Sequence, residues 1–417
     1  MYKINLVEST IYLYLFFLSI DGLIRGLFLS TSVFFFAYIK VGILLILMFY
    51  LYIKVIKFHK ITILNFIYIS ILCISILIAL ENNISIYQSL FALQILLISI
   101  IAYEFKYEVN LSNLLKLLTF LLYLSIFGLV FNYFVDFPWQ NHLVNIDGYE
   151  ITTGINGSMG EFRRLSGFSV SNGVLSFFIF SCFLMISIIK YYTLNYFKLF
   201  NHIWYISFVG LILSALKTTI FVFLMINIFM IFYNLSIRYK LVNILLVVLK
   251  LFSLVYLISP FFIAIYMYIN RAVVDYSANS LFENDFNRIL FATMADRIIR
   301  VWPKGLSLIT EPHIFIFGRG LGGIGVAQNI FEPDLYTSGD SLFIQLLVTI
   351  GAPLTFLLLM YFIVKLFTKD IIDSLLVFTL LIISVTHNII DSPILLFLFF
   401  FFYQYKSKGY KKCSNLR

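Results

Sequence analysis

Long, nearly uncharged apolar segments follow one another along most of this chain. A helix needs about 20 mostly apolar residues to cross a bilayer, and twelve segments approach that length. They lie near residues 6–24, 33–53, 61–80, 86–103, 114–135, 171–189, 200–216, 218–235, 241–268, 339–364, 374–389 and 392–405. A transmembrane β-barrel needs shorter segments of alternating polarity, so the pattern predicts membrane-spanning helices.

The composition excludes the other broad classes. Of 417 residues, 62% are hydrophobic and only 12% are charged, whereas soluble domains average roughly 45–50% apolar and about 25% charged residues. One soluble core could not bury so much apolar surface. The expected fold is an all-α polytopic membrane protein with about 12 transmembrane helices, in which residues 1–417 form a single integral membrane domain.

The basic residues of the short connections predict the topology. Lysine and arginine favour the cytoplasmic side, and they recur in every second connection, for example at Lys54 to Lys60 and at Arg238 and Lys240. This pattern predicts a multi-pass protein of the cytoplasmic (inner) membrane with both termini in the cytoplasm. The basic C-terminal tail contributes much of the net charge of +9, and we interpret this tail as a membrane anchor. We therefore expect no nucleic-acid partner.

Two long polar segments, 136–170 and 270–338, fall on the opposite side and form two large extracytoplasmic loops. Many transporters instead keep short connections and place polar residues at mid-membrane. Charged residues inside the apolar segments are few here, mainly Lys40, Lys116 and Lys250. The distribution favours an enzyme that acts at the outer membrane surface over a carrier.

The first loop ends with Arg163 and Arg164, just before an apolar segment. A guanidinium group offers a planar fork of donors that matches phosphate oxygens at any physiological pH. Both residues are therefore candidates for phosphate binding. An interfacial anchor that contacts lipid headgroups is the alternative.

The second loop carries Arg288, Arg297 and Arg300 within a stretch of helical spacing that ends near Trp302. Residues three apart in an α-helix share a face, which predicts that Arg297 and Arg300 project together. An amphipathic helix that lies on the membrane surface is the alternative interpretation.

Five glycines follow within eight residues, around Arg319, and include Gly318, Gly320 and Gly322. Gly318, Gly320 and Gly323 formally match the spacing of a dinucleotide fingerprint, but that motif requires a strand–turn–helix in a cytosolic βαβ unit. Successive backbone N–H groups here could form an anion-binding nest. A re-entrant turn of glycines is the alternative.

Asp340 precedes the apolar segment that contains Gly351. A carboxylate at this position either caps the helix or takes the proton of a substrate hydroxyl. No histidine–carboxylate cluster has the spacing of metal ligands, so we predict neither a metal nor a cofactor.

In this ordered set of features the chain resembles the O-antigen and capsular polysaccharide polymerases, which are related to the O-antigen ligases. The likeness combines many helices with four motifs in the outer loops. The motif residues are Arg164, Gly167 and Asn172; Arg297, Arg300 and Trp302; Gly318, Gly320 and Gly323; and Asp340, Ser341 and Gly351.

The resemblance implies a C-type glycosyltransferase architecture and a metal-independent polymerase. Its donor and acceptor would be glycans linked to undecaprenyl diphosphate, in O-antigen or capsule biosynthesis, with membrane lipid and a chain-length regulator as further partners. The residues expected to bind the diphosphate or glycan are Arg163, Arg164, Arg288, Arg319, Gly320 and Gly322. The residues expected to act in catalysis are Asp340, Arg297 and Arg300, with Asp340 on the acceptor hydroxyl.

Two other functions stay open. An O-antigen ligase would transfer finished glycan to a lipid A core, and ligases of this kind tend to carry a histidine where this chain has Asp340. A flippase or transporter would move the lipid-linked unit across the membrane, and the number of predicted helices fits that function as well.

Overall fold

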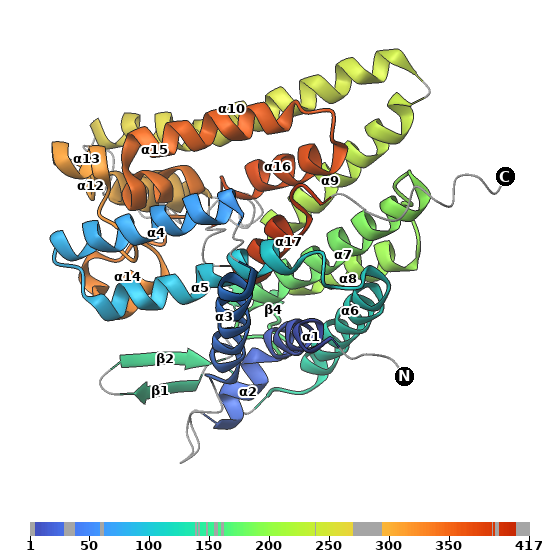
Figure 1. The fold of residues 1–417 in the computed structure, drawn as a ribbon, viewed down its shortest axis with the longest axis horizontal. Coiled ribbons are helices and arrows are strands. Elements are labelled where there is room, and N and C mark those ends of the chain that lie inside the picture. Colours follow the sequence, from blue (N-terminus) through green and yellow to red (C-terminus); the bar gives the residue numbers. More distant parts are fainter. Residues whose placement is uncertain are drawn as a thin grey trace. The chain divides into compact units, whose positions relative to one another are not determined.

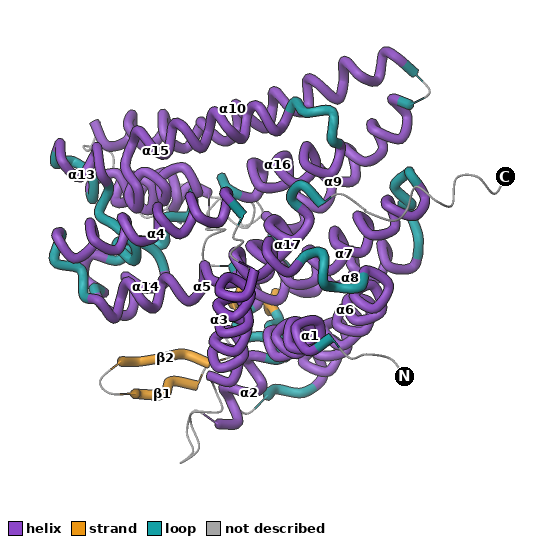
Figure 2. Tube along the Cα trace, in the orientation of Figure 1, coloured by secondary structure: helices purple, strands orange, loops and turns teal. Residues whose placement is uncertain are grey.

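The computed structural model shows a mostly helical chain (Figures 1 and 2). It describes residues 5–28, 38–58, 62–137, 140, 142–146, 149–153, 157–159, 162–237, 239–269, 294–385, 387 and 392–405. The chain divides into two compact units. Unit 1 comprises Met1–Lys60, Ile98–Leu246 and Ile394–Arg417, and unit 2 comprises Ile61–Leu97 and Val247–Pro393.

Unit 1 is built around one buried helix, α7. Of the residues in its most apolar stretch, 18 residues long, 78% are buried. Helices α6, α8 and α9 each contact α7. Two helices, α5 (Ile86–Phe105) and α10 (Lys240–Ile269), run from one unit into the other. The other helices of unit 1 are α1 (Leu6–Ser19), α2 (Asp21–Phe28), α3 (Ile39–Phe58), α6 (Leu111–Phe134), α7 (Asn172–Leu194), α8 (His202–Ser214), α9 (Lys217–Ser236) and nearly all of α17 (Pro393–Phe402).

Polar side chains fix where several of these helices begin. The Asn110 side chain accepts hydrogen bonds from the backbone N–H groups of Ser112 and Asn113, and Ser171 accepts one from Val174. These bonds satisfy donors that a helix N-terminus leaves without an intrahelical acceptor. Local sequence therefore sets the starts of α6 and α7.

The predicted first loop contains two antiparallel hairpins that the sequence did not indicate. Strand β1 (His142–Ile146) pairs with β2 (Tyr149–Thr153), and β3 (Gly157–Met159) pairs with β4 (Phe162–Arg164) (Figure 2). The chain then turns into α7 through Gly167, whose φ of +54° brings its backbone against Gly128. A side chain at Gly167 would be strained in this left-handed conformation.

Unit 2 combines two longer helices with a series of short ones. Helix α15 contains a break at Gly351, where the backbone is not helical. A short π-helix (Arg297–Val301) precedes α12, and a 3₁₀ turn (Pro333–Leu335) follows α14. The helices are α4 (Ile63–Glu81), α12 (Trp302–Ser307), α13 (Pro312–Phe317), α14 (Val326–Phe331), α15 (Leu342–Leu366) and α16 (Ile371–Ile383).

Each predicted span overlaps at least one helix, but the count of twelve spans is not confirmed. Among the described residues, seven helices are long and apolar enough to cross a membrane, namely α3, α5, α6, α7, α9, α10 and α15. An eighth span results if α1 and α2, bent by 72°, count as one. The other predicted spans coincide with shorter apolar helices such as α8, of 13 residues. At 1.5 Å per residue, such a helix covers about 20 Å of a core roughly 30 Å thick.

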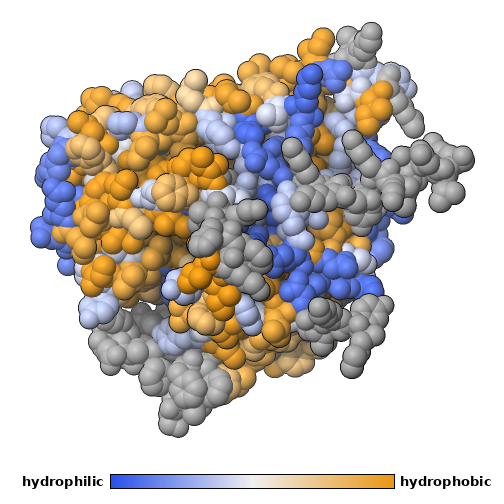
Figure 3. Space-filling model, viewed as in Figure 1, coloured by the Kyte–Doolittle hydropathy of each residue, from blue (hydrophilic) through white to orange (hydrophobic). Residues whose placement is uncertain are grey.

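Large apolar side chains lie on the outside of the molecule as well as inside it. Leu77, Val255 and Leu357 are 66%, 70% and 66% exposed, and Figure 3 shows apolar residues across large parts of one face. Water would disfavour so much exposed apolar area, whereas lipid tails accept it. The chain is a membrane protein.

Candidate functional site

Asp340 forms the centre of the strongest candidate site, in unit 2. Its Oδ2 accepts a hydrogen bond from Arg297 Nε at 3.0 Å, and the two side chains are 23% and 15% exposed. Ser341, not Asp340, occupies the N-cap position of α15. The structure therefore joins two predicted catalytic residues and differs from the interpretation of Asp340 as a helix cap.

Contacts on both sides hold the π-helix that carries Arg297. The Trp302 N–H donates to the Arg297 carbonyl, and the Thr337 hydroxyl donates to the Val301 carbonyl at 3.1 Å. Trp302 itself is fully buried. Single π-helical turns occur often at functional sites, where they change the direction of a side chain. Here the turn presents Arg297 to Asp340.

Arg300 lies apart from this pair. Its guanidinium bonds to Asp296, and 67% of its side chain is exposed. The sequence predicted that Arg297 and Arg300 share one face, as in an α-helix. A π-helix places more residues in each turn, so residues three apart diverge, and the structure does not bring Arg300 to Asp340.

His387, which follows α16, was not among the predicted site residues. Burial and the nearby positive charge of Arg297 lower the pKa of His387 to about 3, so its imidazole is neutral at physiological pH. The Leu342 N–H donates to the Ser384 carbonyl at 2.7 Å, which ties the start of α15 to the end of α16. In the sequence, the only indication of a role for His387 was its position between two apolar segments.

Backbone carbonyls already accept several N–H groups of the glycine segment, where the sequence predicted an anion nest. The backbone N–H groups of Gly318, Arg319, Leu321 and Gly323 all donate to backbone carbonyls. For example, the Leu321 N–H donates to the Ser75 carbonyl on α4 at 3.0 Å. These four donors stabilise the fold and are not available to a bound anion.

Close packing explains why glycines are needed there. A Cβ on Gly320 would lie 2.3 Å from the backbone nitrogen of Ala79 on α4, and one on Gly322 would lie 3.0 Å from the Gln88 carbonyl oxygen on α5. Both glycines have φ of +92°. The close approach that the glycines allow is therefore to neighbouring helices.

Arg319 is engaged within the same segment. Its Nη1 donates to the Gly323 carbonyl at 3.0 Å, and its Nη2 pairs with the Glu332 carboxylate at 3.4 Å. Arg319 is 9% exposed. These contacts give Arg319 a role inside the fold, and its predicted role in diphosphate binding remains untested.

The other predicted arginines are described only in part. Arg164 ends β4 in unit 1 and is half-buried. Arg163 belongs to the same strand, but its side chain is outside the described part of the structure, and Arg288 lies outside the described residues altogether. Their predicted roles remain predictions.

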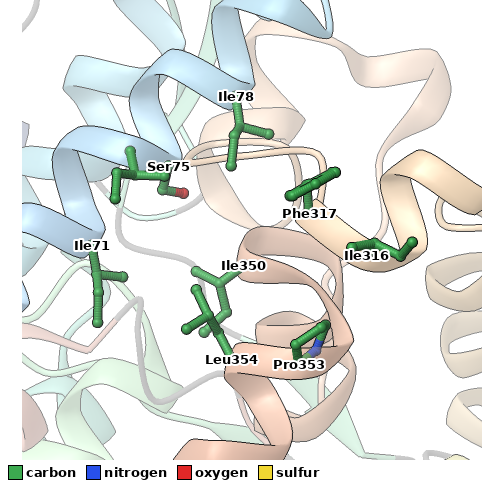
Figure 4. Close-up of a pocket in the computed structure, with 9 residues that line it drawn as sticks. Ile71, Ser75, Ile78, Ile316, Phe317, Ile350, Pro353 and Leu354 are labelled. Carbon is green, nitrogen blue, oxygen red and sulfur yellow. The ribbon is translucent and has the colours of Figure 1, made fainter.

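An apolar groove of about 200 Å³ lies within unit 2 (Figure 4). Its walls come from α4, α13 and the part of α15 around the Gly351 break. Ser75 is the one residue with a polar side chain among those that line it, and its hydroxyl donates to the Thr349 carbonyl at 3.3 Å. The lining residues are Ile71, Ile74, Ser75, Ile78, Ile316, Phe317, Ile350, Pro353 and Leu354.

Within the described ranges, no three histidine, cysteine, aspartate or glutamate side chains gather as metal ligands would. No protein-family model, no curated protein and no solved structure matches this chain.

Proposed function

We propose that this protein is a metal-independent polysaccharide polymerase at the outer face of the cytoplasmic membrane. It would join oligosaccharide repeat units that are linked to undecaprenyl diphosphate, for O-antigen or capsule biosynthesis. The observation that carries the proposal is the Arg297–Asp340 pair, at 3.0 Å and partly exposed, in front of a membrane helix. The resemblance in the outer loops supports the same function.

The pair supplies the two groups that the reaction needs. When the anomeric C–O bond to the donor's diphosphate breaks, negative charge develops on the leaving phosphate, and a guanidinium stabilises it. The acceptor hydroxyl forms the new glycosidic bond and gives its proton to the Asp340 carboxylate. Arginine carries a planar, permanently charged fork of N–H donors. The Nε bond orients the Asp340 carboxylate, and the proposal assigns the phosphate oxygens to the same guanidinium.

The apolar groove supports a substrate with a lipid tail. It adjoins Ile350 on α15, the helix that begins just after Asp340. From Leu342 to Ile350 the helix rises roughly 12 Å. A hydrocarbon chain in the groove would therefore lie roughly 12 Å along α15 from the charged pair.

A lipid-linked-unit transporter is the second candidate, and one observation in unit 1 favours it. Asp21, at the 72° bend between α1 and α2, is 5% exposed and pairs with Lys40 at 2.5 Å and with Arg25 at 3.2 Å. Ionisable groups within a membrane segment are costly and often mark transport pathways. Broken helices are common in transporters.

The test is the length of surface glycan in cells that carry single substitutions. Arg297→Ala and Asp340→Asn should leave the protein in the membrane, lower polymerisation on the order of 100-fold, and yield glycan of one repeat unit. Lys369→Ala removes an exposed basic residue of unit 2 and serves as the control.

Each alternative predicts a different product. Long chains retained in both Arg297→Ala and Asp340→Asn cells would refute the proposed roles. Long chains stranded on the carrier lipid in a deletion strain would indicate a ligase. Repeat units that accumulate on the cytoplasmic leaflet of that strain would indicate a transporter.

A further inference from the structure

Four buried polar atoms near the Arg297–Asp340 pair have no hydrogen-bond partner among the described residues. They are Trp302 Nε1, Gln328 Nε2, Ser341 Oγ and Gln345 Oε1. The first three residues are fully buried and Gln345 is 2% exposed. A buried polar group without a partner is costly, so water or a ligand is expected to bind groups of this kind. We refer to these four atoms as the orphan groups.

Hydrogen bonds link the residues that carry the orphan groups within unit 2. Gln328 Oε1 accepts from the Thr337 N–H at 3.0 Å, and the Thr337 hydroxyl donates to Val301, the residue before Trp302. Gln345 lies one helical turn beyond Ser341, whose carbonyl accepts its N–H at 2.9 Å. These bonds tie Gln328 to the residue before Trp302, and Gln345 to Ser341.

Helix packing joins the Trp302 side to the Ser341 side. Helix α12 contacts α15, and a Cβ on Gly305 would lie 2.7 Å from Ile344. Trp302 lies three residues before Gly305, on the same face of the helix. Asp340 directly precedes Ser341 in the chain, and 23% of its side chain is exposed. The orphan group of Ser341 is therefore one residue from the partly exposed pair.

The chemistry of the orphan groups identifies the class of ligand. The indole N–H and the Gln328 amide nitrogen only donate, the Gln345 carbonyl only accepts, and the Ser341 hydroxyl does both. A phosphate offers acceptors alone and would leave Gln345 without a partner. A cation would leave the two N–H groups without one. Hydroxyl groups donate and accept, so a polyhydroxylated neutral molecule satisfies all four.

We propose that the orphan groups bind hydroxyls of a sugar ring in the acceptor glycan, beside Asp340. This inference rests on the proposed polymerase function, because the acceptor hydroxyl must reach the Asp340 carboxylate. It assigns the acceptor sugar to Trp302, Gln328, Ser341 and Gln345, and leaves the diphosphate to Arg297. Ordered water is the competing occupant, since water also donates and accepts.

Direct binding tests the proposal without requiring turnover. The chain has three tryptophans, so a variant with Trp139→Phe and Trp204→Phe retains Trp302 as the only indole. The probe is the repeat-unit oligosaccharide, released from its lipid diphosphate and titrated into the full-length variant in nanodiscs. Its binding should change the Trp302 emission in a saturable way. An emission that stays constant, while equilibrium dialysis also detects no bound oligosaccharide, would overturn the proposal.

Matched substitutions show which atoms bind. Gln345→Leu and Ser341→Ala should each weaken oligosaccharide binding roughly threefold to tenfold, the range for one neutral hydrogen bond. Ser207→Ala removes a comparably buried hydroxyl of unit 1 and should leave affinity unchanged. Unchanged affinity together with a higher Tm in both unit 2 variants would show that the orphan groups hold only water.

The assay separates the failure of this inference from that of the proposed function. Oligosaccharide that binds at Trp302 in a protein unable to elongate lipid-linked units would support the sugar site and refute the polymerase. Elongation that proceeds with the same KM for the acceptor in wild type and Gln345→Leu would refute the sugar site and support the polymerase.

Discussion

At the scale of single residues, the charge of Arg297 acts on more than one neighbour. Its guanidinium pairs with Asp340 and helps to keep His387 neutral. Tyr256 on α10 also lies within range of its charge. A neutral imidazole can donate and accept hydrogen bonds without adding a second positive charge beside the guanidinium. Among the described residues, the charge of this site therefore depends mainly on Arg297 and Asp340.

His387 makes the stability of the fold depend on pH. Its pKa is about 3 in the folded protein and about 6.5 when unfolded. Between these values the unfolded state binds more protons, so stability falls as pH falls from 6.5 toward 3. We expect the free energy of unfolding to be about 2 kcal/mol lower at pH 5 than at pH 7 from this residue.

Thermal unfolding of the purified protein across this pH range measures the effect. His387→Gln should flatten the dependence of Tm on pH. His313→Gln removes a histidine that is 61% exposed and should keep the wild-type slope. The same slope in wild type and His387→Gln would show that His387 is not held neutral by the fold.

Arg319 and Glu332 allow a second test at this scale. Because the pair is 10% and 21% exposed, Arg319→Ala leaves a partly buried carboxylate without its cation and should cost roughly 2–3 kcal/mol. Arg319→Ala combined with Glu332→Ala should recover part of that stability. The Tm and the membrane abundance of the single and the double variant measure these effects. A single variant with normal stability and abolished polymerisation would instead assign Arg319 to the diphosphate.

At the scale of elements, the break in α15 decides how unit 2 packs. Gly351 has φ 76° and ψ 172°, and Gly318 has φ 83° and ψ 175°, a region of backbone conformation almost confined to glycine. A Cβ on Gly351 would lie 2.1 Å from the Ile316 carbonyl oxygen, and one on Gly318 would lie 2.6 Å from that of Thr349. The two backbones thus touch directly, beside the apolar groove.

Gly351→Ala should consequently destabilise the protein by about 2 kcal/mol or more, because both the conformation and the contact exclude a side chain. Gly42→Ala is the matched control, since a Cβ at Gly42 meets nothing within 4 Å, and it should be neutral or slightly stabilising. Thermal unfolding of the purified variants compares them. Equal Tm values would mean that α13 and α15 do not pack backbone to backbone.

At the scale of the whole molecule, the predicted sidedness of the chain is the property on which the proposed function depends. The β1–β2 hairpin belongs to unit 1, and the segment between α12 and α13 belongs to unit 2. The lysine and arginine pattern predicts that both lie outside the cell membrane. The connection between α7 and α8 should lie in the cytoplasm.

Thiol labelling of intact cells tests this topology. In a background with the three native cysteines replaced by alanine, a membrane-impermeant maleimide should label Glu150→Cys and Thr310→Cys. Lys198→Cys should react only after the membrane is opened. Labelling of either outer position only in opened cells would place that loop in the cytoplasm and remove the basis of the polymerase proposal.

The sequence by itself determined the membrane class, the positions of the apolar helices and the Arg297 and Asp340 candidates, because these depend on local hydropathy and residue chemistry. Only the tertiary structure decided that Arg297 meets Asp340 while Arg300 does not, since a π-helix changed the spacing of an α-helix. Likewise, a run of glycines looks alike in sequence whether it meets an anion or a helix backbone. The contact of Gly320 with α4 depends on residues more than 200 positions away, and no local pattern records it.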